Sequence, residues 1–253
     1  MRVAVFMSGS GTNIQKLLDL EKSLRKENKA IPFEVVFIFS DRSDGKCRGE
    51  FLAREAGIPY FSYDIRRFHE IRNVKRTVRT ADGLRLRREY DSVARKLIQA
   101  FDVDISALGG YMSYITLDRC VNVHPADLSI QNEDGSRMFV GDDAVLDAIK
   151  AGQAELRAST LWADAGVDTG PLLMVSDPLP VQLPDRIELL AKDPERLRRI
   201  ADEHQEQLKQ VGDWRIFPQT ILMIAQGRFA IDENSMIYLD GKTTPRGYRQ
   251  GVS

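Results

Sequence analysis

The stretch RVAVFMSGSGTNIQKLL, residues 2–18, indicates the fold most clearly. Residues 2–7 form an apolar run of strand type, and a helical pattern opens at Asn13. A turn that contains Gly9 and Gly11 therefore joins a strand to a helix. Glycines let the backbone approach a bound group closely, and the free N–H groups and dipole of a helix N-terminus favour an anion. The turn thus predicts a site for a phosphorylated small molecule, with a simple capped turn as the alternative.

The turn matches neither of two common nucleotide motifs. It lacks the third glycine of the dinucleotide fingerprint and the lysine that follows the second glycine of the Walker loop. The sequence therefore does not predict a dinucleotide or a nucleoside triphosphate at this turn.

Further strand-like runs at residues 33–40, 105–109 and 121–124 alternate with helical stretches, which is typical of a doubly wound, mostly parallel α/β sheet. From about residue 156 the pattern changes to strands joined by short turns, 156–163 and 172–179, which predicts an antiparallel extension. Ligands of such folds bind outside the carboxyl ends of the strands. We expect one domain over residues 1–253, with a phosphate-binding, Rossmann-like half at 1–125 and a second half at 126–253.

Charged helices are expected after this extension. Asp193 and Pro194 are a plausible cap and first turn for a helix that runs toward Val211. A second helix is expected near residues 216–226, and residues 230–231 and 236–239 could close the chain as a small hairpin.

Two polar residues interrupt the strand-like run CVNVH, residues 120–124. Alternate side chains of a strand point to the same face, so Asn122 and His124 would converge. An amide can donate a hydrogen bond to a developing oxyanion, and an imidazole can donate a hydrogen bond or move a proton near neutral pH. The pair predicts stabilisation of a tetrahedral intermediate, although a single histidine is more often a satisfied core residue.

Asp168 lies in a predicted loop, AGVDTG at residues 165–170, between two strand-like runs. Catalytic residues are common in such loops. A carboxylate beside His124 would orient the imidazole and favour its charged form. An ordinary turn role for Asp168 is the alternative, because Asp before Thr-Gly is common turn chemistry.

In their order along the chain, these motifs resemble those of folate-dependent formyltransferases, above all the phosphoribosylglycinamide (GAR) formyltransferase family. The resemblance covers nearly the whole chain. It rests on SGSGTN at 8–13, DISALGGYM at 104–112, NVHP at 122–125, DTGP at 168–171, YLDG at 238–241 and RGY at 246–248.

The resemblance implies formyl transfer from the co-substrate 10-formyltetrahydrofolate to the amine of phosphoribosylglycinamide in purine biosynthesis, without a metal. It makes residues 126–253 the folate-side half with C-terminal helices. It implies the following site residues: Asn122, His124 and Asp168 as the catalytic group, Gly11, Thr12, Asn13 and Arg87 on the substrate phosphate, Asp213 on the ribose, and Met112, Ser113, Ile115, Val167 and Thr169 on the cofactor.

The chain departs from this family in several places. After His124 the family usually has Ser-Leu-Leu-Pro, whereas this chain reads ADLSIQ at 126–131. Ser113 stands where the family tends to carry an arginine, and Leu161 stands where a histidine is common. Two alternatives therefore stay open. The chain could be a related formyltransferase that acts on another amine, or a catalytically impaired protein that binds a phosphorylated metabolite.

The stretch from about residue 66 to residue 85 looks inserted and is rich in basic residues. Such a run could meet a polyanion, such as nucleic acid or a polyglutamylated cofactor tail, but we favour a solvated helical face. Its basic residues are Arg66, Arg67, Arg72, Lys75, Arg76, Arg79 and Arg85, opposed by Glu70 and Asp82.

Composition fits a soluble enzyme with a sizeable core, since 43% of the 253 residues are hydrophobic. The net charge of −1 disfavours a dedicated nucleic-acid binder. No apolar run approaches the roughly 20 residues that span a bilayer, so we expect a cytoplasmic protein, monomeric or homodimeric, with a small-molecule substrate. Cys47 and Cys120 have no metal-binding spacing and are expected to be reduced thiols.

Overall fold

The computed structural model describes residues 1–27 and 31–249. These residues form two compact units, which divide between Asn122 and Val123. The single domain expected from the sequence, with its halves at 1–125 and 126–253, stays a prediction.

The first unit is built on a parallel sheet whose strands follow the spatial order β3-β2-β1-β4-β5. All four neighbouring pairs are parallel, with Val3 opposite both Val35 and Ile105. The elements are β1 (Arg2–Met7), α1 (Thr12–Lys26), β2 (Glu34–Ser40), α2 (Gly49–Ala56), β3 (Tyr60–Ser62), α3 (Ile65–Ile71), α4 (Ala81–Ala100), β4 (Ile105–Leu108) and β5 (Cys120–His124), which continues to the first two residues of the second unit.

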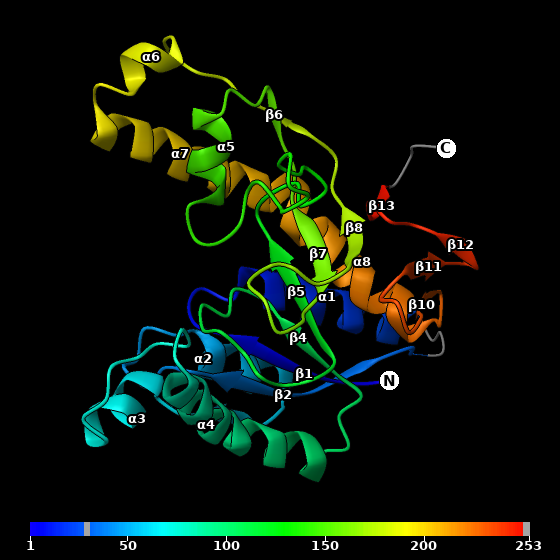
Figure 1. The fold of residues 1–253 in the computed structure, drawn as a ribbon. Helices are drawn as coiled ribbons and strands as arrows, with labels where there is room; N and C mark the ends of the chain where they lie inside the picture. Colours follow the sequence, from blue (N-terminus) through cyan, green and yellow to red (C-terminus); the bar gives the residue numbers. More distant parts are fainter. Residues whose placement is uncertain (28–30, 250–253) are drawn as a thin grey trace. The chain divides into compact units, whose positions relative to one another are not determined.

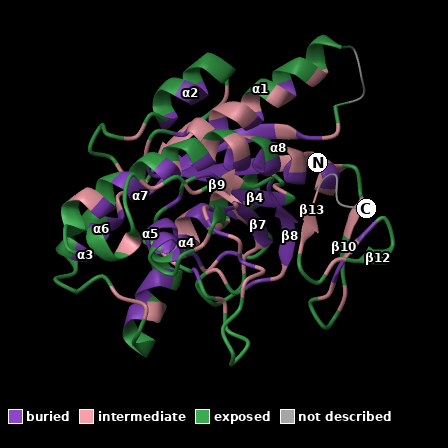
Figure 2. Cartoon of the chain, turned by 90° about the horizontal axis from the view of Figure 1, so that it is seen from above, coloured by how far each residue is buried: buried purple, intermediate pink, exposed green. Residues whose placement is uncertain are grey.

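Strands β1, β2 and β4 of the first unit are largely buried, whereas β3 at the edge of the sheet is partly exposed. Val3 to Met7 of β1 are fully buried, and Phe6 packs edge-on against Phe37 and Tyr111. Side chains of α3 and α4 form a small apolar cluster, and these two helices lie side by side in Figure 1. In Figure 2, α2 is mostly exposed with a buried stripe, as expected for a helix packed on a sheet. Leu52 is one of its buried residues.

The second unit combines an antiparallel strand pair with helices. Strand β8 pairs antiparallel with β7 and parallel with β13, while β10, β11 and β12 form a separate antiparallel sheet. The elements are α5 (Ala144–Lys150), β6 (Glu155–Leu156), β7 (Ser159–Trp162), β8 (Leu172–Val175), β9 (Leu179–Pro180), α6 (Ile187–Leu190), α7 (Pro194–Leu208), the π-helical turn η1 (Lys209–Asp213), α8 (Trp214–Ala225), β10 (Phe229–Ile231), β11 (Ile237–Leu239), β12 (Lys242–Thr243) and β13 (Tyr248–Arg249).

The main sequence-based expectations for the fold are confirmed. The α/β class, the parallel sheet, the antiparallel β7–β8 pair and the β10–β11 hairpin are present. The Asp193 side chain caps α7 by accepting from the Arg196 N–H at 3.0 Å, as predicted. The helix that was expected to run toward Val211 becomes the η1 turn at Lys209. Within the described residues, no helix is long and apolar enough to cross a bilayer.

Gly11 is required at the start of α1 for two reasons. Its φ of 68° lies in the left-handed region, and a Cβ there would lie 2.4 Å from Met7 Cε and 2.8 Å from Leu52 Cδ1. The turn can therefore approach β1 and α2 only without a side chain at this position.

We expect Gly11→Ala to lower the free energy of unfolding by about 2–4 kcal/mol, because backbone strain and overpacking add. Gly57 is the matched control: it has the same φ of 68° at the end of α2, with no atom within 4 Å of a Cβ. Gly57→Ala should lower the free energy of unfolding by only about 1–2 kcal/mol. Urea denaturation of both variants checks this, and equal losses would contradict the steric account.

Candidate active site

Strand β5 presents the polar pair that the sequence singled out. Asn122 pairs opposite Leu108 of β4 and is half-buried. His124, two residues later on the same strand, is 5% exposed. Because side chains alternate along a strand, both emerge on the same face of β5.

The structure brings His124 and Asp168 together within the second unit. The imidazole Nδ1 lies 3.3 Å from Asp168 Oδ2, and both side chains are buried. The other ring nitrogen, Nε2, lies 3.3 Å from the carbonyl oxygen of Phe139. A carboxylate and a carbonyl thus fix the plane of the imidazole.

The Asp168 loop is held from several sides. Arg137 donates through Nη1 to the carbonyl of Asp168 and through Nη2 to the carbonyl of Gly170, the latter at 2.6 Å. The N–H of Gly141 donates to Asp168 Oδ2 at 3.0 Å. Asp168 has a φ of 54°, a left-handed conformation that aspartate tolerates better than most residues. Arg137 therefore fixes the backbone of the loop, while Gly141 fixes the carboxylate.

The loop after His124 supplies these contacts. Ser159 Oγ donates to the carbonyl of Ala126 at 2.7 Å and accepts from the N–H of Leu128 at 3.0 Å. A β-bridge then joins Gln131 to Arg137. This ordered hairpin delivers Arg137, Phe139 and Gly141 to the histidine–aspartate pair.

Sequence reasoning missed Arg137, Phe139 and Gly141. A signal was present in the Asp134-Gly135 pair, which is typical of a tight hairpin turn and would have placed Arg137 on its returning arm. Position 170 also requires a glycine, since a Cβ there would lie 1.8 Å from the carbonyl oxygen of Trp162.

Burial dominates the titration of His124. Removal from water lowers the pKa of His124 below its ordinary value, and the opposing effect of Asp168, although raising, does not overcome it. Asp168 favours the charged form, as expected from the sequence, but burial outweighs its effect in the free protein. Each neutral tautomer can donate to only one of the two acceptors, whereas the protonated ring can donate to both.

The glycine-rich turn of the first unit presents a bare helix N-terminus. Gly11 precedes α1 without any side-chain cap, and the first turn holds no acidic residue. The N–H of Ser8 donates to the carbonyl of Gly110 at 3.0 Å, and Ser8 Oγ accepts from the N–H of Met112 at 2.9 Å. The turn is thereby fixed to the segment that follows β4, and the first N–H groups of α1 suit an anion.

Arg87 is engaged inside the first unit. It is 3% exposed and donates through Nε and Nη2 to Asp91 at 3.0 and 2.8 Å. Its Nη2 also reaches the Tyr111 hydroxyl at 3.2 Å. These contacts position Tyr111, and the role of Arg87 on a phosphate stays a prediction.

The expected cofactor residues differ in exposure. In the first unit Met112 is 62% exposed, whereas Ser113 and Ile115 are buried. In the second unit Val167 is 55% exposed, and Thr169 Oγ1 donates to Asp164 at 2.6 Å. Exposed apolar side chains such as Met112 and Val167 are available to a ligand.

Asp213, expected on the ribose, is buried at the end of η1 in the second unit. In residues 1–27 and 31–249 we find no group of three or more His, Cys, Asp or Glu side chains that could hold a metal ion.

The His124 pKa provides a direct test of this electrostatic balance. By NMR the imidazole should titrate below the ordinary value of 6.5, because burial disfavours its charged form. Asp168→Asn should lower the midpoint further, because it removes the charge that favours the imidazolium. A midpoint above 6.5 in the unaltered protein, or an increase in the variant, would contradict this balance of burial and charge.

Comparisons with known proteins identify the family of the chain. A protein-family model described as formyl transferase matches residues 1–197. The phosphoribosylglycinamide formyltransferase of Mycobacterium tuberculosis is 30% identical over 71% of each chain. That of Haemophilus influenzae is 25% identical over 98% of each chain.

Solved structures include similar folds. Glycinamide ribonucleotide transformylase 1 from Symbiobacterium toebii has a TM-score of 0.64 and 26% identity, with 94% of this chain and 93% of that chain covered. Because the family model covers most of the sequence, the chain belongs to the formyl transferase family.

Proposed function

We propose that this protein transfers the formyl group of 10-formyltetrahydrofolate to the amino group of phosphoribosylglycinamide, in purine biosynthesis in the cytoplasm. The proposal rests on the buried contact between His124 and Asp168. Asp168 orients the imidazole, whose N–H can donate a hydrogen bond to a developing oxyanion. The acceptor is the one named for the relatives in Mycobacterium tuberculosis and Haemophilus influenzae.

Substrate binding begins at the glycine-rich turn. The phosphate accepts hydrogen bonds from the N–H groups at Gly11, Thr12 and Asn13, where the α1 dipole favours negative charge. The carboxylate of Asp213 accepts hydrogen bonds from the ribose hydroxyls. These contacts orient the substrate amine, which lowers the entropic barrier to attack.

The neutral amine attacks the formyl carbon, and the C=O π pair moves to oxygen. Asn122 and His124 donate hydrogen bonds to this oxyanion, and each such donor contributes on the order of 3 kcal/mol. When the intermediate collapses, the carbon–nitrogen bond to folate N10 breaks. The proton lost by the former amine passes, through water held by Asp168, to N10 as it leaves.

The protonation state of His124 changes when negative charge develops on the formyl oxygen. In the free protein burial lowers the His124 pKa, so the neutral ring is favoured. An oxyanion beside the ring favours the imidazolium, which has two N–H groups. The Nδ1–H donates to Asp168, and the Nε2–H, which faces the carbonyl of Phe139 in the free protein, donates to the oxyanion instead. The protonated form is therefore stabilised most when the intermediate is present, which is the condition for catalysis.

The donor is proposed to contact Met112, Ser113 and Ile115 of the first unit and Val167 and Thr169 of the second. The exposed side chains of Met112 and Val167 support this assignment, because both are apolar and accessible to a ring system.

Turnover with defined substrates tests the proposal. Protein mixed with phosphoribosylglycinamide and 10-formyltetrahydrofolate should release tetrahydrofolate only when both are present. His124→Ala should lower kcat by about 10²–10³, with little change in affinity for phosphoribosylglycinamide, because it removes an oxyanion donor.

His204→Gln is the matched control, since His204 is a buried histidine that contacts the carbonyl of Ile200 and the N–H of Gln182. This variant should keep turnover as long as it folds. Release that needs another amine would point to a different acceptor, and unchanged turnover in His124→Ala would contradict the assignment of the site.

A further inference from the structure

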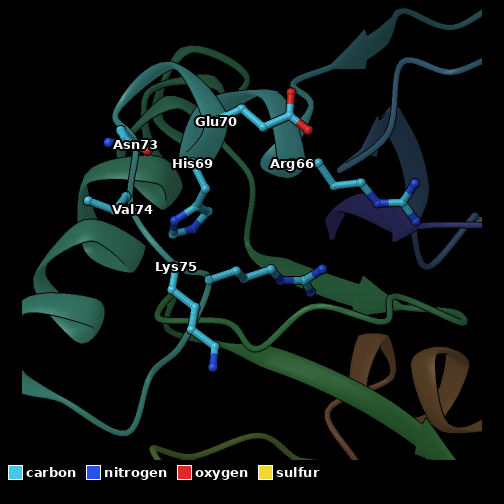
Figure 3. A pocket seen from close by; sticks show the side chains of 7 residues that line it. Arg66, His69, Glu70, Asn73, Val74 and Lys75 are labelled. Carbon is cyan, nitrogen blue, oxygen red and sulfur yellow. The ribbon is translucent and has the colours of Figure 1, made fainter.

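Two clusters of polar side chains stand out in the described part of the chain, outside the histidine–aspartate pair. One lines a shallow pocket of about 510 Å³ beside α3 in the first unit (Figure 3). The other lies in the second unit and includes two residues of the loop after His124, Asp127 and Ser129. Because this loop also supplies the contacts to the His124–Asp168 pair, the second cluster bears directly on the candidate active site.

Arg249 of β13 connects the C-terminal strand to this loop. Its Nη2 donates to Asp127 Oδ2 and to Ser129 Oγ, in both cases at 2.9 Å. The Ser129 hydroxyl in turn donates to Asp127 Oδ1, which also accepts from the Ser129 N–H at 3.0 Å. One guanidinium nitrogen therefore closes a ring of hydrogen bonds over the turn at residues 127–129.

Arg249 also supplies the closest cation to the Asp127 carboxylate. The Asp127 side chain is only 10% exposed, and a carboxylate removed from water is costly unless a cation is hydrogen-bonded to it. The guanidinium of Arg157 is also near, but its Nε lies 3.9 Å from Asp127 Oδ2, and it donates to Glu155 and to the carbonyl of Ser176. Removing Arg249 therefore leaves the carboxylate without its hydrogen-bonded cation.

The sheet fixes the position of Arg249. Strand β13 pairs parallel with β8, beside which it lies in Figure 1, and Arg249 is opposite Val175. The chain reaches β8 through Gly247, whose φ of 73° lies in the left-handed region and where a Cβ would lie 3.1 Å from Val175 Cγ2. A side chain that starts from a paired strand is placed more precisely than one that starts from a loop.

The turn at Asp127 is the base of the hairpin that reaches His124. The carbonyl of Asp127 accepts from the N–H of Ile130 at 3.2 Å, and the carbonyl of Ile130 accepts from the N–H of Met138 at 3.1 Å. The returning arm then carries the carbonyl that lies beside His124 Nε2 and the N–H that donates to the Asp168 carboxylate. A displaced turn would therefore move both of these contacts together.

We propose that Arg249 is a positioning residue for formyl transfer: by binding Asp127 and Ser129, it holds the loop that orients His124 and Asp168. The inference rests on the proposed function and extends it to a residue of the C-terminal strand that acts through other residues. A loop held at its base keeps the imidazole in the geometry in which its N–H meets the oxyanion, and a small misplacement of a catalytic group costs much of the rate.

Formyl transfer by two Arg249 variants tests this. Arg249→Met keeps an apolar stem but removes both hydrogen bonds, so kcat should fall by about 10–100-fold. The KM for phosphoribosylglycinamide should change little, because its phosphate is proposed to bind in the first unit. A single nitrogen of Arg249 makes both bonds, and the lysine ammonium has three N–H donors, so Arg249→Lys should keep most of the activity.

Arg228→Met is the matched control. Arg228 precedes β10 in the same unit and pairs with Asp240 at 2.5 Å, so this variant also loses an arginine ion pair, but one that joins other segments. It should keep the kcat of the unaltered protein. An equal loss of kcat in Arg228→Met and Arg249→Met would overturn the proposal, and so would an unchanged kcat in Arg249→Met.

The titration of His124 by NMR provides a second measurement, which does not depend on turnover. Burial holds the pKa of His124 below its ordinary value of 6.5. In folded Arg249→Met the loosened loop should admit water to the ring, so the midpoint should rise toward 6.5, whereas Arg249→Lys and Arg228→Met should keep the original midpoint. A midpoint that does not move in folded Arg249→Met would contradict the positioning role.

A milder variant covers the case in which Arg249→Met does not fold. Ser129→Ala removes one of the two contacts of Arg249 and should change kcat and the His124 midpoint in the same directions by smaller amounts. Unchanged values of both would overturn the proposal. If the unaltered protein does not transfer the formyl group to phosphoribosylglycinamide, the proposed function fails, whereas the NMR midpoints still decide the role of Arg249.

Discussion

The site depends on one buried contact, between the His124 imidazole and the Asp168 carboxylate at 3.3 Å. Burial alone would leave a neutral histidine that is a poor partner for an oxyanion, because an uncompensated charge is strongly disfavoured away from water. The carboxylate reduces this penalty without removing it, and the charge that develops on the substrate supplies the rest. The free protein therefore favours the neutral ring, whereas the intermediate favours the charged one. This difference between ground state and transition state is what catalysis requires.

That contact defines what the loop after His124 has to supply. The loop supplies three contacts to the site: a carbonyl that lies beside His124 Nε2, an N–H that donates to the Asp168 carboxylate, and a cation that donates to the Asp168 backbone carbonyl. Phe139, Gly141 and Arg137 provide these three contacts. The Ser159 hydroxyl and the Gln131–Arg137 bridge give the loop a defined shape. A changed loop sequence is thus compatible with an intact histidine–aspartate pair.

The sequence predicted the parts of the protein that follow from local periodicity and turn chemistry. The strand–turn–helix unit at Gly11, strand β5 with His124, and the Asp193 cap were all predictable, because each depends on neighbouring residues. It did not predict contacts between distant segments. Arg137 lies 31 residues from the carbonyl it binds, and nothing in a single sequence pairs them. The sign of the His124 pKa shift was also missed, because it depends on how completely the ring is buried. The interpretation of the basic run as a helical face is wrong only for Lys75, Arg76 and Arg79, which lie in the loop between α3 and α4.

A double-mutant cycle on formyl transfer tests the central claim most directly. The kcat/KM values for transfer from 10-formyltetrahydrofolate to phosphoribosylglycinamide are measured for the unaltered protein, His124→Asn, Asp168→Asn and the double variant. If the two residues act as one unit, the second substitution should add little to the loss caused by the first. Losses that multiply would mean that His124 and Asp168 act independently, which would contradict their role as a coupled pair.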